Sequence, residues 1–505
     1  MRQSRANGSF SGVSAAFLGS VLFLAVAVAT ALVYAVWVVW VPLLPDNLYT
    51  PLLDLGKITG YRWPSAAMYL LIVLSLYALY ALGYHLVRRR SVAPAAIFGG
   101  GALMCVLLVW AYPATAVDVF GYVAHGRLLA LHHANPLVVA PNEFPNDAII
   151  PFLAFPGEPS QYGPLWVLVG GAFASLAHTD LLTEILLYKV TGALAHLAGA
   201  GLIYAIAARL ARAPRTALAS AYVYLWNPML LWEMIGNAHN DGVMMLFGLA
   251  AVWLFVAGFD LLVLAGAAAG ALVKAPVALM APFLFVGGWH RRRLRAIEGA
   301  LLAAAFAVAV YRPFWEGTRT LSVLRRTDLF TASLGSVMRL ALAPSVGLPT
   351  ATSVARTVSL TGFALVALIT LLMAMRARSD AGVLRAAYFA LLGAVLLATT
   401  WFQAWYVVWP LALGAALGDG RRHLEVALLS LGGLLQYFVF IYLWVMGVFP
   451  LTENLAVQGS AYLAIVGPLV LGSLGAFTRR PERPGAGWAG GGAVPAGTSR
   501  EAIGG

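Results

Sequence analysis

The chain has 505 residues, of which 61% are hydrophobic and only 10% are charged. This composition excludes an ordinary soluble globular protein, in which roughly half of the residues are apolar and about a quarter are charged. The formal net charge of +12 would suggest a nucleic-acid partner for a soluble protein, but the arginines here stand in short clusters between apolar runs, as the loop charges that orient membrane proteins do.

Apolar runs of about 18 residues or more recur along the chain, and each is long enough to cross a ~30 Å hydrocarbon core as a helix. The first run, 16–42, is too long for the apolar part of a cleaved signal peptide and is predicted to be an uncleaved span. Further spans are expected at 66–86 and 93–112. The positive-inside rule places the N-terminus and the arginine triplet that begins at Arg88 in the cytoplasm.

The longest polar interruption, 113–163, is therefore expected on the external face as a catalytic loop. Asp118 directly follows a span and opens an apparently amphipathic stretch, Val119–Ala134, which is suited to the membrane interface. A carboxylate there can act as a general base toward a hydroxyl. The alternative is that Asp118 caps the N-terminus of that helix.

A second polar motif, His239-Asn240-Asp241, is expected on the same face. The run 164–178 is too short for a sure crossing, so we interpret it as a re-entrant or interfacial helix, followed by a crossing at 184–206. The next run, 217–235, then leads outward to the motif. These side chains could hold sugar hydroxyls, a phosphate or a metal ion. The alternative for Asp241 is a helix cap.

Lys274 stands in an apolar segment, 261–289, that must cross the membrane an even number of times because a basic cluster follows it. We expect the chain to break at Lys274-Ala-Pro276, since proline removes a backbone donor and disfavours helix just before it. Lys274 would then lie near the external side, where an ionisable residue is a functional candidate. The alternative is that Lys274 only reaches toward the interface.

The remaining spans bring the predicted number of crossings to about 13 or 14. The segment 315–355, expected outside, carries arginines against the positive-inside rule: Arg319, Arg325, Arg326, Arg339 and Arg356. Either the topology differs there or these charges meet an anionic ligand or headgroup. Residues 1–480 are predicted to form one membrane domain, and 481–505 a disordered cytoplasmic tail. The one cysteine, Cys105, excludes a disulfide framework.

Aromatic residues are frequent where the expected spans meet the outside, as in an interfacial belt. The cluster that contains Gln403, Trp405 and Tyr406 adds an amide and could stack against a sugar or an isoprenoid.

Together these motifs carry a resemblance to a known family. The residues that match are Asp118-Val-Phe-Gly-Tyr122, Gly126, Asn135-Pro136, Tyr162-Gly163-Pro164-Leu165, Asn227-Pro228, Gly236-Asn-Ala-His239-Asn240-Asp241, Lys274 and Gln403-Ala-Trp405-Tyr406. In this order they resemble the C-type integral-membrane glycosyltransferases, and more closely the actinobacterial polyprenol-phosphomannose-dependent α-1,6-mannosyltransferases of lipomannan assembly. The resemblance implies an all-α fold of many transmembrane helices, an essential acidic residue on an external loop, here Asp118, and a lipid-linked donor.

The predicted function is therefore inverting transfer of a hexose, expected to be mannose, from a polyprenyl phosphate to a glycan or glycolipid hydroxyl at the external face of a bacterial cell membrane. Asp118 is the predicted base. The residues predicted to bind donor or acceptor are Arg127, Tyr162, His239, Asn240, Asp241, Lys274, Arg312, Gln403, Trp405 and Tyr406. No metal ligand is predicted, although a divalent cation stays possible. The alternatives are a transporter or flippase for a lipid-linked glycan and a non-catalytic scaffold.

Overall fold

The computed structural model describes residues 6–211, 213–325 and 329–478, so the predicted tail 481–505 and Arg326 lie outside the described residues. Within them the chain folds into helices, and the β contacts are two isolated bridges, Pro42 with Ala111 and Thr331 with Trp401. The predicted all-α polytopic membrane class is confirmed.

Eight of the described helices are long and apolar enough to cross a membrane. They are α1 (Ala6–Trp40), α3 (Trp63–Arg89), α7 (Leu181–Ala211), α13 (Arg293–Tyr311), α15 (Leu348–Arg376), α16 (Asp380–Gly393), α18 (Gly420–Tyr437) and α19 (Leu455–Thr478). Short turns of other helix types extend three of them: η6 (Arg312–Phe314) extends α13, η8 (Ala394–Ala398) extends α16 and η10 (Phe438–Trp444) extends α18. A bent pair adds a ninth candidate: α9 (Pro228–Leu230) with η4 (Leu231–Gly236), then α10 (Asp241–Ala257), at 116°.

Shorter apolar helices fill the space between the long ones. They are α4 (Pro94–Leu108), α6 (Pro164–Ala177), α11 (Val263–Val273), α14 (Leu334–Val346) and α17 (Val408–Ala416), which follows η9 (Ala404–Val407). The predicted total of about 13 or 14 crossings requires these short helices to cross as well, so that number stays a prediction. The other elements are α2 (Leu55–Thr59), α5 (Asp118–Ala130), α8 (Pro214–Leu225), α12 (Ala281–Arg291), η1 (Asn47–Tyr49), η2 (Pro141–Glu143), η3 (Ile150–Phe152), η5 (Ala275–Met280) and η7 (Gly317–Arg325).

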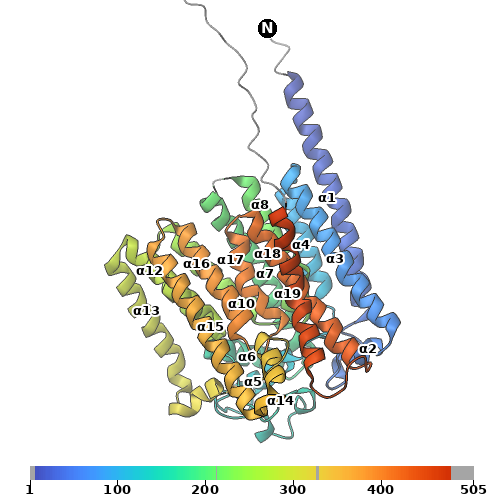
Figure 1. The fold of residues 1–505 in the computed structure, drawn as a ribbon, viewed down its shortest axis with the longest axis vertical. Helices are drawn as coiled ribbons and strands as arrows, with labels where there is room; N and C mark the ends of the chain where they lie inside the picture. The colour runs from blue at the N-terminus through green and yellow to red at the C-terminus, as the bar shows by residue number, and fades with distance from the viewer. Residues whose placement is uncertain (1–5, 212, 326–328, 479–505) are drawn as a thin grey trace, which may run out of the picture.

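The helices form one bundle whose two ends differ (Figure 1). The long helices run roughly along the vertical of the view, and α2, α5, α6 and α14 lie at the lower end. The start of α1 and helix α8 lie at the upper end. The segment 113–163, with its ionisable residues, therefore lies at the end of the bundle away from the start of α1.

Helix α5 corrects one prediction, because it is not an amphipathic helix on the membrane surface. Every residue from Tyr122 to Leu128 is buried, and α5 packs against α6 and α7. A Cβ atom on Gly126 would lie only 2.4 Å from the carbonyl oxygen of Gly170 in α6, so two glycines allow this close crossing. The sequence predicted an amphipathic interfacial helix, but the neighbouring elements bury every residue from Tyr122 to Leu128, on all sides of the helix.

The predicted break at Lys274 is confirmed. Helix α11 ends at Val273, Lys274 has an extended backbone, and η5 then leads into α12. Pro276 explains the break, because its ring and missing N–H interrupt a helix. The chain therefore presents Lys274 at a turn between two helical segments.

The segment 315–355 contains helix α14 and the start of the long helix α15, which begins at Leu348. Two of its arginines meet protein carboxylates. Arg339 pairs with Glu453, and Arg319 lies 3.3 Å from Glu316. These charges are therefore partly compensated within the protein.

Candidate functional site

Asp118 is half-buried and is the first residue of α5. The cap position belongs to Val117, so the alternative that Asp118 caps the helix does not hold. The Tyr162 hydroxyl donates a hydrogen bond of 2.9 Å to Asp118 Oδ1. Burial first, and then the Asp118 charge, raise the pKa of Tyr162 well above its usual value. Tyr162 thus stays neutral and can hold the carboxylate by donating to it.

Tyr162 also contacts Lys274, whose Nζ lies 5.7 Å from the centre of the tyrosine ring. The contact follows from the way the Tyr-Gly-Pro motif packs on the end of α11. The Gly163 amide donates to the Val273 carbonyl at 3.0 Å, and Pro164 occupies the first turn of α6. Asp118 and Lys274, far apart in sequence, therefore contact the same side chain.

Replacing Gly163 by alanine is expected to disturb this junction. An added Cβ would lie 2.1 Å from the Leu272 carbonyl oxygen, a contact that only a backbone shift can relieve. We expect a loss of about 1 to 3 kcal/mol in stability and a larger loss of activity, because the shift moves Tyr162 and Lys274 apart. Thermal unfolding in detergent measures the first effect. Gly99→Ala in α4 is the matched control, because a Cβ at Gly99 meets nothing within 4 Å.

Lys274 forms an ion pair with Asp241, with 2.6 Å between Nζ and Oδ2. The Asp241 side chain is 0% exposed and also accepts a hydrogen bond of 2.9 Å from Trp409 Nε1. The cap of α10 is Asn240, so the capping alternative for Asp241 does not hold either. Because a buried carboxylate holds the ammonium group, Lys274 is fixed in place, while 15% of its side chain stays exposed.

The His239-Asn240-Asp241 motif lies at the 116° bend between η4 and α10. Asn227 caps the start of the bent segment, since its side chain accepts from the amides of Met229 and Leu230. The Tyr122 hydroxyl lies 3.4 Å from Asn240 Oδ1. Asn240 Nδ2 is buried and has no hydrogen-bond partner among the described residues.

Glu233 was not predicted as a site residue, although a carboxylate in an apolar run was a usable signal. It is fully buried in η4 and accepts hydrogen bonds from Asn237 Nδ2 at 2.8 Å and from the Tyr437 hydroxyl at 3.0 Å. His239 Nε2 lies 3.2 Å from Glu233 Oε2, and its ring stacks on Trp405 at 3.8 Å. Within the described chain, no group of three potential ligands is placed to hold a metal ion.

The side chains of the Gln403-Ala-Trp405-Tyr406 cluster lie in three different places, because the tight turn of η9 points successive side chains in different directions. Gln403 lines a pocket, Trp405 stacks on His239, and the Tyr406 ring lies 5.4 Å from Lys274 Nζ. The members of the motif therefore lie apart, and stacking of the motif against a sugar or an isoprenoid stays a prediction.

Arg127 does not suit the predicted role at the donor phosphate. Its guanidinium is 5% exposed and is already bound by two carboxylates, Glu184 and Asp147, the latter at 3.0 Å. Burial alone would lower the pKa of Arg127, but Glu184 and Asp147 outweigh it and raise the pKa. Arg312 is exposed in η6. No ion pair of Arg312 is found among the described residues, so its predicted role stays open.

The segment 113–163 should lose stability in acid. Burial lowers the pKa of His125 to about 4, below its usual 6.5, so the folded state holds His125 neutral. The unfolded chain binds a proton below about pH 6.5, and stability is therefore full above that pH and falls between pH 6.5 and 4. We expect a loss of about 3 kcal/mol from this residue. The difference in unfolding temperature between wild type and His125→Gln, measured from pH 7 to 4, should shrink as the pH falls, and a constant difference would contradict the prediction.

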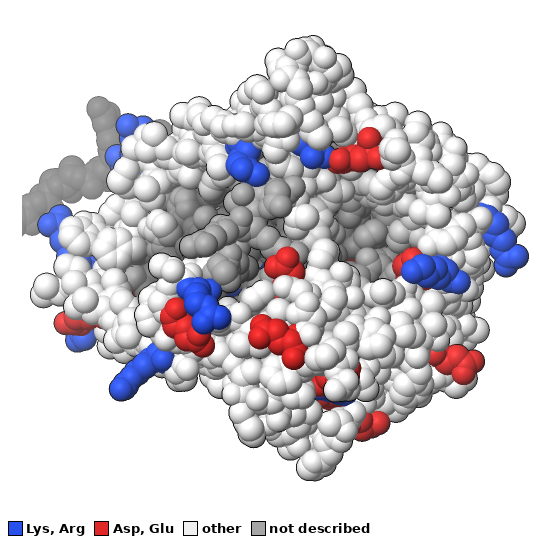
Figure 2. Space-filling model, turned by 90° about the horizontal axis from the view of Figure 1, so that it is seen from below, with Lys and Arg blue, Asp and Glu red and all other residues white. Residues whose placement is uncertain are grey.

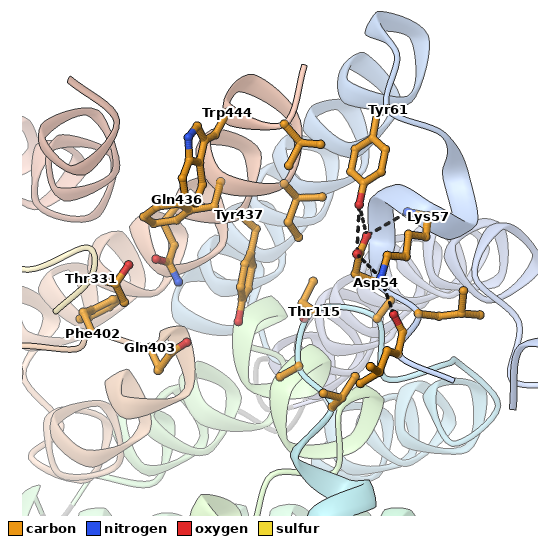
Figure 3. A pocket seen from close by; sticks show the side chains of 18 of the residues that line it. Asp54, Lys57, Tyr61, Thr115, Thr331, Phe402, Gln403, Gln436, Tyr437 and Trp444 are labelled. Atoms are coloured by element: carbon orange, nitrogen blue, oxygen red, sulfur yellow. Dashed lines mark hydrogen bonds and ion pairs between the residues drawn. The ribbon is translucent and has the colours of Figure 1, made fainter. Parts of the chain in front are cut away.

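A pocket of about 590 Å³ opens beside the segment that leads into α5. The residues Ala114 to Val117, which directly precede Asp118, form part of its wall. Asp54, Lys57 and Tyr61 lie on one side of it, and Gln403, Gln436 and Trp444 on the other (Figure 3). Seen from below, the same end of the molecule is hollowed, with acidic and basic side chains around the hollows (Figure 2).

Comparison with known proteins bears on this arrangement. Residues 16–291, more than half of the chain, match the family described as Alpha-(1->6)-mannopyranosyltransferase, N-terminal domain. Alpha-(1->6)-mannopyranosyltransferase A of Mycobacterium tuberculosis is 26% identical over 363 residues, which cover 66% of this chain and 67% of that protein. Two relatives from Corynebacterium glutamicum match over less. Transferase A is 26% identical over 37% of this chain and 38% of its own length, and transferase B is 25% identical over 32% and 26%. The chain belongs to the alpha-(1->6)-mannopyranosyltransferase family.

Proposed function

We propose that the protein transfers mannose from a polyprenyl-phosphate donor to a hydroxyl of a glycan or glycolipid acceptor, with inversion, and that Asp118 is the general base. The observation that carries the proposal is the pair of contacts at Tyr162. This one side chain binds the half-exposed carboxylate of Asp118 and lies against the ammonium of Lys274. A base and a cation for a leaving phosphate therefore stand next to each other.

The chemistry needs one proton transfer and one displacement. Asp118 takes the proton of the acceptor hydroxyl while that oxygen forms a bond to the anomeric carbon, and the bond from this carbon to the phosphate oxygen breaks. The departing phosphate is already an anion, so no second carboxylic acid is required, in contrast to glycoside hydrolysis. Tyr162 keeps the carboxylate oriented toward the acceptor by donating to one oxygen, which leaves the other free.

Lys274 is the group proposed to stabilise the departing phosphate. An ammonium is a compact point charge, and one that is positioned beforehand requires no reorganisation during the reaction. Asp241 and Trp409 hold it in place, while its partial exposure leaves room for a second anion. Asn240, whose Nδ2 has no hydrogen-bond partner among the described residues, is proposed to orient the sugar.

We further propose that this end of the bundle faces outside the cytoplasm and that both termini lie inside. The arginine clusters at 88–90 and 291–295 support this, since the positive-inside rule assigns such clusters to the cytoplasm. Labelling of single cysteines introduced at Glu143 and at Arg292 in intact cells, with a reagent that does not cross membranes, tests the orientation. Only the first should react, and labelling of the second alone would reverse the assignment.

A transfer assay tests the proposed function. Purified protein, given a synthetic polyprenyl-phosphomannose and a short α-1,6-linked oligomannoside, is expected to produce the oligomannoside extended by one mannose. Mass spectrometry detects the product, and proton NMR of the new linkage reports the inversion or retention. If wild-type protein yields no extended product under any condition that preserves its fold, the proposed function is wrong.

A transporter of a lipid-linked glycan is the second candidate, because broken helices are also frequent in transporters. The described residues include breaks of this kind at the 116° bend before α10 and at the turn at Lys274. Movement of a labelled lipid-linked glycan across proteoliposomes, equal in wild type and Asp118→Asn, would favour transport. If the protein is a transferase, product formation should depend on Asp118 and the labelled glycan should not cross the membrane.

A further inference from the structure

We propose that the 590 Å³ pocket bounded by Asp54, Lys57, Gln436 and Trp444 is the binding site for the acceptor, and that it recognises a neutral, hydroxyl-rich oligosaccharide rather than the phosphate of the donor. This inference rests on the proposed function. We call this cavity the acceptor pocket. Its volume lies within the roughly 300 to 1,000 Å³ that ligand sites occupy.

The first observation is that amide side chains in the pocket lack hydrogen-bond partners. Gln436 is 3% exposed and lines the pocket, yet its side chain has no hydrogen-bond partner among the described residues. The Gln403 side chain, on the same side of the pocket, also has none there. Both amides line open space in the pocket, so a ligand that displaces water from them must offer hydrogen bonds in exchange. A ligand with several hydroxyl groups, each a donor and an acceptor, would satisfy both amides.

The second observation is the charge of the lining. Asp54 and Lys57 are the ionised residues of the described lining, and they lie 3.6 Å apart, so their charges offset each other. The Tyr61 hydroxyl donates to both oxygens of Asp54, at 2.8 and 3.0 Å. No net positive charge is left for a phosphate. Lys274, the cation beside Tyr162, does not line this pocket.

The third observation is the place of the pocket relative to Asp118. Thr115 lines it and is fixed by hydrogen bonds from Trp232 Nε1 at 3.0 Å and from Asn237 Nδ2 at 2.6 Å. Asp118 follows Thr115 by three residues. Its side chain contacts Tyr162, which in turn lies against Lys274. An inverting displacement needs the attacking and departing oxygens on opposite faces of the sugar ring. The acceptor pocket lies beside the chain that leads into Asp118, whereas Lys274 lies against the Tyr162 ring that holds the Asp118 carboxylate. We assign the attacking oxygen to the pocket and the departing oxygen to the side of Lys274.

Aromatic rings complete the pocket. Trp444 lies at the end of η10 and faces the side that carries Asp54 and Tyr61 (Figure 3). Flat aromatic rings can stack on the apolar face of a pyranose, while the amides and the carboxylate can form hydrogen bonds with its hydroxyl groups. The occupant that matches this combination is a short mannoside, whereas an isoprenoid chain would leave the polar groups without partners.

The test separates acceptor from donor binding by steady-state kinetics. Trp444→Ala and Gln436→Met are each expected to raise the KM for an oligomannoside about tenfold to a hundredfold, a loss of roughly 1.4 to 3 kcal/mol, with an unchanged KM for the donor. Trp63→Ala removes an exposed tryptophan that does not line the pocket. It is the matched control and should leave both values unchanged.

Each outcome of these measurements supports or contradicts one of the two proposals. An unchanged acceptor KM in both variants, or a change confined to the donor KM, would overturn the acceptor pocket but leave the transferase intact. Absence of transfer by wild type would instead overturn the proposed function. If Gln436→Met does not fold, judged by its unfolding temperature, Gln403→Ala replaces it, because that amide faces the same pocket and is half-buried.

Discussion

Replacing Asp118 by asparagine is expected to lower the rate of mannosyl transfer by roughly a hundredfold to ten-thousandfold, the range that a general base contributes, without loss of folding or donor binding. The amide oxygen can still accept the hydrogen bond from Tyr162, so the local structure should persist. An amide, however, does not take up a proton from the acceptor hydroxyl. Single-turnover transfer with radiolabelled donor measures the rate, and binding of that donor is measured in parallel.

Asp46→Asn is the matched control for this experiment. Asp46 lies in the chain before α2, is exposed and makes no capping hydrogen bond. Its replacement should leave the rate within about twofold of wild type, since exposed substitutions of this kind change free energies by about 0.5 kcal/mol or less. Full turnover by Asp118→Asn would remove Asp118 from the chemistry, whereas failure of donor binding would make it a binding residue.

Removing the Lys274 charge is expected to have the second largest effect, on both stability and donor affinity. Lys274→Met leaves the fully buried carboxylate of Asp241 without its ion partner. Breaking a buried pair in this way costs about 3 to 5 kcal/mol. The double variant Lys274→Met with Asp241→Asn should recover most of that stability, because no buried charge is then left unpaired.

The same double variant separates the structural role of Lys274 from its role in donor binding and transfer. If Lys274 stabilises the leaving phosphate, the double variant should unfold like wild type but bind the donor weakly and transfer slowly. Thermal unfolding in detergent and equilibrium binding of labelled donor measure the two effects. Arg295→Met, which removes a cation from the exposed ion pair with Glu298, is the control and should change stability by less than about 1 kcal/mol. Recovery of activity together with stability would assign Lys274 a structural role only.

The individual motifs of the site could be predicted from the sequence, but their contacts could not. Ionisable residues are costly in a membrane segment, so Asp118, Asp241 and Lys274 stood out from an apolar background. Asp118 is more than a hundred residues from the other two, however, and Lys274 is 33 residues from Asp241, and these separations say nothing about which helix ends meet. The contact depends on the close packing of Gly163 against Leu272, which no hydropathy pattern reveals.

The sequence also suggested roles that the structure reassigns. Arg127 resembles a free cation in the sequence, but the fold places Glu184, 57 residues away, against its guanidinium. Gln436 stands in an ordinary apolar span and attracted no attention, although its amide faces the acceptor pocket. Glu233, about two turns before the His239-Asn240-Asp241 motif, was noticed beside it but not included among the predicted site residues. Whether a polar side chain is paired depends on partners from other helices.

The amino-acid sequence by itself determined that this is an all-α membrane protein, because apolar runs of span length leave the backbone no other way to satisfy its hydrogen bonds in lipid. It also placed the break at Lys274, since proline acts locally. Only the tertiary structure decided which carboxylate is buried and paired, as Asp241 is, and which stays half-exposed, as Asp118 does. Burial and pairing depend on the side chains that distant helices bring together, and the order of residues along the chain does not show which helices meet.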